Sequence, residues 1–283
     1  PMRVRRGWWG STCWVRRDAL WRAGRWGWSA KSFPVPAALD AALKEFVTMI
    51  IEAERRSMNE KETQADVIIV GAGMVGAALA ALLGETGIAV TVLDARPGPL
   101  DGSTVGRGRP AQRVSALTPV SQRLLSGLSV WSWMAARRVS PYTGMQVWDA
   151  EGSGEVNFDA EQAGTPVLGH IVENEVTLTA LEKRLAELPS ITQLFDARLE
   201  TLRATAQGRQ VVLDDGRQLT APLVVAADGA RSRLRELAGI DAHIQETGQA
   251  ALVTTVRTER GHAGVARQNF LPSGPLAFLP LAV

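Results

Sequence analysis

The hydrophobic pattern of residues 65–96, ADVIIVGAGMVGAALAALLGETGIAVTVLDAR, predicts a strand, a glycine turn, a helix and a second strand in immediate succession. The first strand covers the β-branched run Asp66–Val70, and the helix begins near Met74. The second strand, Ile88–Leu93, is followed at once by the acidic residue Asp94. A strand, helix and strand of these lengths form the βαβ unit of a Rossmann-like α/β fold.

Patterned stretches continue through the middle of the chain. Thr118 and Pro119 are a cap and first-turn pair for one helix. Leucines at three- and four-residue steps predict a second helix that Asn174 caps. Apolar residues in Trp131–Asp149 and Val156–Phe158 indicate an excursion that contains strands.

Three glycines of the first turn, Gly71, Gly73 and Gly76, have the spacing of a dinucleotide-binding motif. Each glycine has its own physical task in such a motif. Gly71 permits the tight turn, Gly73 lets the backbone approach a pyrophosphate, and Gly76 lets the helix pack against its strand.

The backbone at the start of the predicted helix is a candidate phosphate site. Free amides around Met74 and Val75, at the positive end of the helix dipole, can bind an anion without a lysine. Asp94 follows Gly76 by 18 residues, and its carboxylate can accept hydrogen bonds from both hydroxyls of an adenosine ribose. The complete strand, helix, strand and acid context identifies a dinucleotide site, while the residues alone leave NAD and FAD both open.

Two more polar positions are candidates for the same site. Arg113 lies shortly before the helix at Thr118, where a guanidinium can hold phosphate or ribose, and an ordinary surface arginine is the equal alternative. A hairpin and the buried strand Leu223–Ala227 lead to Asp228-Gly229, where the carboxylate can accept local amide or arginine hydrogen bonds and fix the loop. The alternative for Asp228 is a simple turn.

His170, within LGHIVEN, is interpreted as a structural histidine with satisfied hydrogen bonds. We see no partner in the sequence that would activate it as a base. No other residue pattern indicates a nucleophile or an acid and base pair, so we name no catalytic residue.

Composition narrows the class of protein. The 283 residues, 46% of them hydrophobic, can bury a substantial core. No apolar run approaches the roughly 18 to 20 residues that span a bilayer. Cys13 is the single cysteine, so no internal disulfide forms, and no Cys/His cluster has zinc spacing. We expect a globular protein of the reducing cytoplasm, without a metal.

Charge is unevenly distributed along the chain. Residues 1–31 contain seven arginines, one lysine and one aspartate, a net +7, which leaves −5 of the whole-chain +2 for residues 32–283. The mildly acidic body argues against a nucleic-acid-binding protein. Residues 1–31 also contain six of the nine tryptophans, so they are either a basic aromatic arm or, as we favour, upstream sequence ahead of a start at Met58. A helix over Ala37–Arg56 belongs either to the body or to that leader.

Six stretches between Asp66 and Leu281 carry motifs that can be compared with known families. They are DVIIVGAGMVG, RVSALTPVSQRLL, GMQVWDAEGSGEVNFD, LGHIVENEVTLTAL, VVAADGARSRLRELAGI and QNFLPSGPLAFLPL. Together they resemble the aromatic-ring flavoprotein monooxygenases, specifically the ubiquinone-biosynthesis hydroxylases. Residues 113–174 are especially similar to the members that hydroxylate a 2-polyprenylphenol at ring position five.

The resemblance implies a Rossmann-like FAD-binding domain of the p-hydroxybenzoate-hydroxylase type with a β-sheet substrate domain. It implies FAD as cofactor, NAD(P)H as electron donor, and O₂ and a polyprenylphenol-type lipid as substrates. It also implies that Arg113 contacts the flavin nucleotide and that Asp228 lies near the FAD pyrophosphate and the path of NAD(P)H. In such enzymes the flavin carries the oxygen chemistry and the protein positions the ring. A lipid substrate is compatible with peripheral contact at the inner membrane and with other ubiquinone-biosynthesis proteins as partners.

The chain departs from the family in one respect. The family closes its flavin site with a later segment of the form GDAAH, and no such sequence occurs before Val283. We therefore expect an amino-terminal fragment with an incomplete substrate sheet and little hydroxylase activity. The expected organisation is a leader over 1–57, an FAD-binding unit and the following helix over 58–140, a substrate-domain excursion over 141–170, the remainder of the FAD-binding domain over 171–240 and the start of the substrate sheet over 241–283.

Two other functions stay open at this point. One is an FAD- or NAD-dependent oxidoreductase that inserts no oxygen. The other is a truncated, non-catalytic product that binds only nucleotide or partner subunits. Oxygen consumption that depends on a phenol and yields a hydroxylated product would separate hydroxylation from both.

Overall fold

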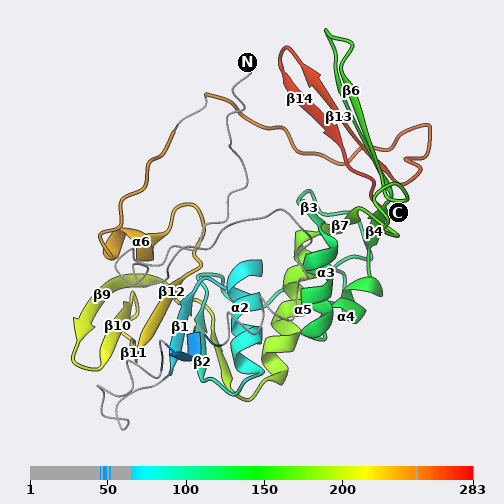
Figure 1. Cartoon of the computed structure of the whole chain (residues 1–283). Helices are drawn as coiled ribbons and strands as arrows, with labels where there is room; N and C mark the ends of the chain where they lie inside the picture. Colours follow the sequence, from blue (N-terminus) through cyan, green and yellow to red (C-terminus); the bar gives the residue numbers. More distant parts are fainter. Residues whose placement is uncertain (1–44, 46, 50, 52–64, 246–247, 283) are drawn as a thin grey trace, which may run out of the picture.

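A parallel sheet of four strands lies at the centre of the protein, as the computed structural model shows (Figure 1). The structure describes residues 45, 47–49, 51, 65–245 and 248–282. The strands follow the order β12-β1-β2-β8. Strand β1 therefore lies between β2, the next strand in the sequence, and β12, which comes much later in the sequence. Their bounds are Val67–Val70 for β1, Val90–Leu93 for β2, Ile191–Leu194 for β8 and Leu223–Ala226 for β12.

Helices cover one face of this sheet. Side chains alternate between the two faces of a strand, and Val67 and Ile69 of β1 point to the face that packs against helices α2 (Met74–Gly84) and α5 (Asn174–Glu187). Both valine and isoleucine are completely buried. The α2 helix is rich in alanine and glycine, which lets it approach both the sheet and α5 closely.

A second sheet covers the other face. Its three antiparallel strands are β9 (Leu199–Thr205), β10 (Gly208–Leu213) and β11 (Gln218–Ala221), and β10 and β11 form the predicted hairpin. Ile68 and Val70 of β1 pack with this sheet and with the short helix α6, Arg233–Leu237. Because both faces of β1 are covered, its sequence is an uninterrupted apolar run. The predicted Rossmann-like α/β fold is confirmed.

A small third sheet and two helices extend the helical side of the protein. The sheet has the order β3-β7-β4, with β3 at Val114–Leu117, β4 at Val139–Tyr142 and β7 at Gly169–Glu173. Helix α3 covers Pro119–Gly127, and the side chain of Thr118 accepts a hydrogen bond from the Ser121 N–H at 3.2 Å, which confirms the predicted cap. Helix α4 covers Trp131–Ala135.

One helix in this part was missed, and one predicted helix cap was wrong. Trp131–Ala135 is helical because Met134 is fully buried against the helical core, so the strands of the excursion begin only at β4. Asn174 does not cap α5: Glu173 holds that position, and the Asn174 Oδ1 accepts a hydrogen bond from the Ser115 hydroxyl at 2.6 Å. Val75, in the first turn of α2, is 58% exposed.

The fourth sheet projects away from the other three (Figure 1). It has the order β14-β13-β5-β6 and joins two segments that are far apart in the chain. The first segment contributes the hairpin of β5 (Gly144–Asp149) and β6 (Glu155–Asp159), and the second contributes the hairpin of β13 (Val265–Leu271) and β14 (Gly274–Phe278). Strands β5 and β13 run parallel and join the hairpins.

Most of the predicted leader, residues 1–57, lies outside the described residues, and so does Met58. The described positions of the expected Ala37–Arg56 helix, residues 45, 47–49 and 51, are helical. Val47 and Ile51 are 7% and 4% exposed and belong to the core cluster that contains α2 and α5. At these two positions the chain packs on the body.

Candidate functional site

Three strands of the parallel sheet end side by side and bring the predicted site residues to one edge. Val70, the last residue of β1, pairs with Leu93 of β2 and with Ala226 of β12. The backbone continues this alignment beyond the strands, since the Gly71 N–H donates to the Leu93 carbonyl and the Ala227 N–H donates to the Val70 carbonyl, each at 2.8 Å. The carboxyl edge of a parallel sheet is where such folds bind ligands.

Two glycines of the turn have no room for a side chain. Gly71 has a φ of 101°, and a Cβ there would lie 2.4 Å from the Ala227 carbonyl oxygen. A Cβ at Gly76 would lie 2.0 Å from the Gly71 carbonyl oxygen. Both distances are far inside van der Waals contact with backbone atoms, so the turn and the start of α2 require glycine at these positions.

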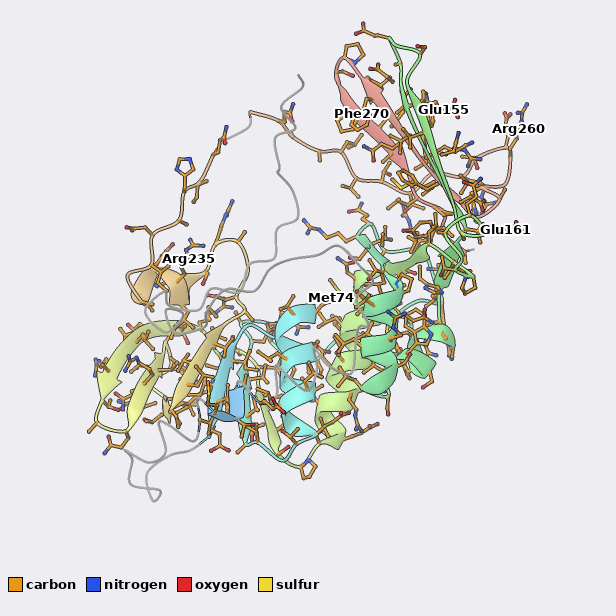
Figure 2. All side chains as sticks on the ribbon, in the orientation of Figure 1. Met74, Glu155, Glu161, Arg235, Arg260 and Phe270 are labelled. Carbon is orange, nitrogen blue, oxygen red and sulfur yellow. The ribbon has the colours of Figure 1, made fainter. Side chains whose placement is uncertain are left out.

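Gly73 differs from its two neighbours in the motif. A Cβ at Gly73 would meet no atom of the described chain within 4 Å, so this side of the turn is open. Gly73 is the N-cap of α2, without a side-chain cap and with no acidic residue in the first turn. Within the described residues, the N–H groups of Met74 and Val75 have no hydrogen-bond acceptor. Open space beside unpaired amides at a helix start suits an anionic group. Figure 2 shows Met74 at that end of α2.

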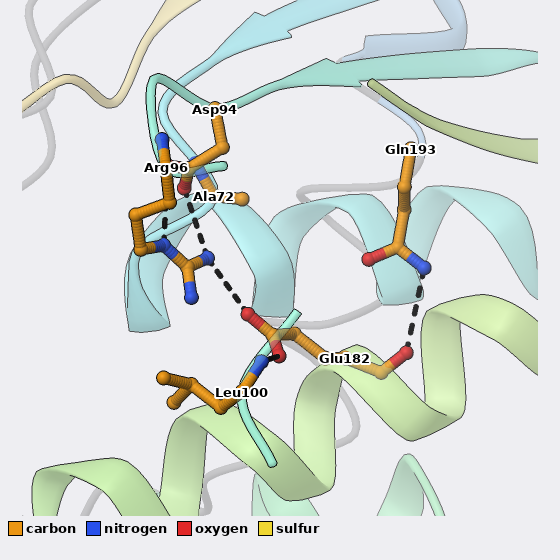
Figure 3. Close-up of polar contacts among 6 residues, drawn as sticks. All are labelled: Ala72, Asp94, Arg96, Leu100, Glu182 and Gln193. Atoms are coloured by element: carbon orange, nitrogen blue, oxygen red, sulfur yellow. Dashed lines mark hydrogen bonds and ion pairs between the residues drawn. The ribbon is translucent and has the colours of Figure 1, made fainter. Parts of the chain in front are cut away.

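Asp94 lies beside the glycine turn and bridges it to the loop after β2 (Figure 3). Its Oδ2 accepts a hydrogen bond from the Ala72 N–H at 3.1 Å. Its Oδ1 accepts one from the Arg96 N–H at 2.8 Å. The Arg96 guanidinium binds both oxygens, with Nε at 3.1 Å from Oδ1 and Nη2 at 3.0 Å from Oδ2.

Arg96 also joins this site to α5. Its Nη2 lies 2.7 Å from Oε1 of Glu182, whose side chain is only 3% exposed. The other Glu182 oxygen accepts a hydrogen bond from the Leu100 N–H at 2.9 Å. Burial lowers the pKa of Arg96, but its hydrogen bonds to Asp94 and its contact with the Glu182 carboxylate outweigh burial and raise the pKa above the usual value. The guanidinium therefore stays charged between the two carboxylates.

Asp228 follows β12 and organises its own loop. Its Oδ1 accepts a hydrogen bond from the Ser232 hydroxyl at 2.5 Å, and its Oδ2 accepts one from the Leu234 N–H at 3.1 Å. Gly229 reverses the chain with a φ of 85°. The hydrogen bond from a local backbone amide that the sequence predicted is therefore present. The second donor to Asp228 is the Ser232 hydroxyl and not an arginine side chain.

Arg113 lies on a different part of the protein. It precedes strand β3, not helix α3 as its sequence position indicated, and its carbonyl accepts a hydrogen bond from the Asn174 N–H at 3.0 Å. The loop before it is held by Glu173, which accepts from the Ala111 N–H and pairs with Arg138, both at 2.6 Å. The structure thus gathers the glycine turn, Asp94 and Asp228. Within the described residues, no hydrogen bond or ion pair joins the exposed Arg113 side chain to them.

Sequence reasoning missed the Arg96–Glu182 and Arg138–Glu173 pairs. Arg96 stands two residues after Asp94, which is a short enough spacing to have indicated a contact with the carboxylate. Glu182 and Glu173 gave no such signal, because Glu182 is 86 residues from Arg96 and Glu173 is 35 residues from Arg138 in the chain.

His170 is buried on β7 with its ring 4.9 Å from Trp131 in an edge-on arrangement. Burial lowers the pKa of His170. The expectation of satisfied hydrogen bonds was wrong for one ring nitrogen, since Nδ1 is buried without a partner in the described part of the chain. The ring packs against apolar neighbours, and no carboxylate pairs with it among residues 65–245.

Within the described ranges, metal-ligand clusters and membrane-spanning helices are both absent. No group of three or more His, Cys, Asp or Glu side chains there could hold a metal ion. None of the helices described combines the length and the apolar character needed to cross a bilayer.

Similarity to known proteins identifies the family of the chain. The model of a family described as FAD binding domain matches residues 64–270. The chain therefore belongs to the FAD-binding domain family, as the fold and the glycine turn indicated. The curated relatives that it matches include ubiquinone-biosynthesis hydroxylases, which confirms the resemblance stated from the sequence.

Two bacterial relatives illustrate this placement. The chain is 38% identical over 217 residues to 3-demethoxyubiquinol 3-hydroxylase of Escherichia coli, covering 76% of this chain and 54% of that protein. It is also 38% identical over 217 residues to ubiquinone hydroxylase UbiL of Rhodospirillum rubrum, covering 77% of this chain and 49% of that protein. The chain thus spans about half the length of the curated relatives it matches.

Solved structures agree on the fold. Pseudomonas aeruginosa PqsL in complex with 2-aminobenzoylacetate matches 77% of this chain and 58% of its own, with a TM-score of 0.64 and 24% identity. A single-residue variant of Klebsiella pneumoniae HpxO, complexed with FAD, matches 78% of this chain and 55% of its own, with a TM-score of 0.58 and 18% identity. These likenesses confirm the fold class of FAD-dependent monooxygenases.

Proposed function

We propose that the glycine turn and Asp94 hold the ADP half of FAD. The observation that carries this proposal is the open side of the turn at Gly73, which lies beside unpaired backbone amides and a carboxylate in a chain of the FAD-binding family. Gly71 and Gly76 shape the turn, the amides of Met74 and Val75 bind the pyrophosphate, and Asp94 binds the ribose hydroxyls.

Arg113 and Asp228 have supporting parts in this proposal. Asp228 fixes the loop after β12, which reaches the same edge of the sheet as Gly71. In this position it supports the pyrophosphate site and the approach of NAD(P)H, the proposed electron donor. Arg113 is proposed to contact the flavin nucleotide from the small sheet, because its guanidinium is exposed and the loop before it is tied down by Glu173.

The proposed reaction is hydroxylation of an aromatic ring in ubiquinone biosynthesis. FAD, when bound, supplies the reduction of O₂ and the transfer of one oxygen atom to the ring. The residues described here bind and orient the cofactor. The support is the family of the chain and the names of its relatives, which are hydroxylases of demethoxyubiquinol and of ubiquinone.

A polyprenylphenol is the proposed substrate. The projecting sheet offers an apolar face of suitable character, because strand register places Met145 opposite Phe158 and Val147 opposite Val156 on one side. Phe270, labelled in Figure 2, continues this face on β13. Val156, Phe158 and Phe270 are each about half exposed, at 53%, 52% and 48%. Such a face suits an isoprenoid chain and a peripheral contact at the inner membrane, where other ubiquinone-biosynthesis proteins are proposed partners.

Substitution of two glycines tests the cofactor proposal. Gly73→Ala should fold like the wild type, because the new methyl meets no atom within 4 Å, yet it should weaken FAD binding about tenfold or more by occupying the pyrophosphate side. Gly76→Ala is the matched control for an alanine that does not fit, and it should destabilise the fold by about 1–3 kcal/mol through overpacking. FAD affinity is measured by flavin fluorescence and stability by urea unfolding.

Wild-type FAD affinity in a folded Gly73→Ala protein would contradict the proposed pyrophosphate position. The hydroxylase proposal is tested separately, because the chain spans only about half of its relatives. We predict that residues 1–283 alone bind FAD but consume O₂ with a polyprenylphenol at a rate near background. Dehydrogenation of a substrate without oxygen insertion would favour the alternative oxidoreductase.

A further inference from the structure

The carboxylate of Asp94 has no acceptor capacity left in this structure. An ionised carboxylate offers about four lone-pair sites, two on each oxygen. Oδ1 accepts from the backbone N–H and from Nε of Arg96, and Oδ2 accepts from the Ala72 N–H and from Nη2 of Arg96. One backbone donor belongs to the glycine turn and the other to the loop after β2, and both are held by the fold. The two side-chain donors of Arg96 are therefore the ones that the two hydroxyls of a ribose could replace.

Arg96 is shared between two carboxylates. Its Nη2 lies 3.0 Å from Asp94 Oδ2 and 2.7 Å from Glu182 Oε1. Glu182 is fixed, because its side chain is buried on α5 and its second oxygen accepts from the Leu100 N–H. The side chain of Arg96 is 29% exposed, and its guanidinium carbon lies 5.8 Å from the centre of the Phe195 ring. It therefore has an ion-pair partner that stays in place when the contact with Asp94 is broken.

We propose that Arg96 occupies the ribose position of Asp94 and that a nucleotide binds by displacing its guanidinium onto Glu182. This makes Arg96 a specificity-determining residue of the nucleotide site. The inference rests on the proposed function, in which Asp94 binds the ribose. Displacement leaves neither charge alone, because Arg96 keeps Glu182 and Asp94 receives two hydroxyl donors in place of the guanidinium.

The exchange selects for a vicinal diol. A ligand with both ribose hydroxyls replaces both side-chain hydrogen bonds of Asp94, whereas a ligand without them would leave the carboxylate facing only its backbone donors. Phosphate groups alone bind at the amides of the turn and have no reason to move Arg96. The site therefore binds a ligand with a complete adenosine more tightly than an anion of the same charge that lacks it.

Two nucleotide probes test the proposal with the whole chain, AMP and 2′,3′-dideoxy-AMP, by isothermal titration calorimetry. Arg96→Met keeps the length of the side chain and removes its donors. It should tighten AMP binding by about five- to tenfold, the gain from removing a competitor held by charge-assisted hydrogen bonds. Binding of dideoxy-AMP should change less than about twofold, since that ligand brings no hydroxyls to Asp94. Weaker AMP binding, or an equal change for both probes, would overturn the inference.

Glu182→Gln gives a second and opposite test, which also decides the matter if Arg96→Met does not fold. Without the charge of Glu182, Arg96 pairs with Asp94 alone and is harder to displace, so AMP should bind about three- to fivefold more weakly. Unchanged or tighter AMP binding would count against displacement.

Arg184→Met is the matched control. Arg184 lies on α5 and bridges two glutamates, Glu85 at 3.2 Å and Glu187 at 3.1 Å, as Arg96 bridges two acids. Its loss should leave both affinities unchanged. The outcomes also separate the inference from the proposed function. If Asp94→Asn weakens AMP binding but Arg96→Met does not strengthen it, only the displacement is wrong. If the folded wild type binds neither AMP nor FAD, both fail.

Discussion

Two sheets of this protein carry apolar side chains and bury them to opposite degrees. In β1 of the parallel sheet, Val67, Ile68 and Ile69 are completely buried. In the projecting sheet, Val156 and Phe158 of β6 are about half exposed. The difference shows that an apolar side chain in a strand does not determine its own burial. The elements that its connections bring against it do.

Chain connectivity explains the difference. A parallel pair such as β1 and β2 needs a crossover, and here the crossover is α2, which covers one face, while the sheet β9–β11 covers the other. The β5–β6 pair is a hairpin, which needs only a short turn and brings no covering element. In the described residues, apolar side chains of the projecting sheet such as Val156 and Phe158 therefore stay about half exposed.

The largest effect is expected from a substitution in β1, the strand that is covered on both faces. Ile69→Ala removes a side chain that is 0% exposed and packed beneath α2 and α5, so it should lower the free energy of unfolding by about 2–5 kcal/mol. Urea unfolding followed by circular dichroism measures the change. Val156→Ala is the matched control on the exposed strand and should cost less than about 0.5 kcal/mol. Equal losses at both positions would show that β6 is as buried as β1.

The sequence predicted the parts of the fold that depend on local pattern. β1, α2 and β2 follow one another without interruption, and each has its own periodicity or glycine signal. The helix at Trp131–Ala135 was missed because five residues with two tryptophans carry no helical period, and only the buried Met134 decides its conformation. The pairing of β5 with β13 was also out of reach, since it joins segments about 120 residues apart and no local pattern encodes register.

The candidate site divides in the same way. Gly71, Gly73, Gly76 and Asp94 were found because the motif fixes their spacing in sequence, and parallel register then brings them to one edge. Glu182 could not be found, because it comes to Arg96 from a helix that begins 78 residues after Arg96. Contacts between elements depend on how those elements pack, and a single sequence does not state this.

An intermediate effect is expected at His170, which lies on β7, in the small sheet between the two regions compared here. Burial lowers its pKa in the folded protein relative to the unfolded chain. As the pH falls below about 6.5, the unfolded chain takes up the proton first, so stability that is complete above this pH is lost as the pH falls towards the folded pKa. His170→Gln should reduce this loss, which for one group cannot exceed about 1.4 kcal/mol per pH unit.

Urea unfolding at pH 7 and pH 5 measures this loss, and the exposed His243 supplies the control. His243→Gln should leave the difference between the two pH values as it is in the wild type. If His170→Gln also leaves this difference unchanged, the His170 ring is solvated, and the buried core does not extend to β7.

The smallest expected effect lies on the projecting sheet, at Phe158. The side chain is 52% exposed and directly opposite Met145, so its fold contacts amount to a cross-strand pair worth about 0.2–1 kcal/mol. Phe158→Ser should therefore lower the free energy of unfolding by less than about 1 kcal/mol, while weakening binding of the chain to vesicles that contain a polyprenylphenol.

Asn157→Ser, one residue away and on the opposite face, is the control and should leave vesicle binding unchanged. A loss of several kcal/mol in Phe158→Ser would mean that this face is covered within the chain itself, because only a packed aromatic side chain costs that much to remove. The contrast between the two sheets would then be one of position and not of burial.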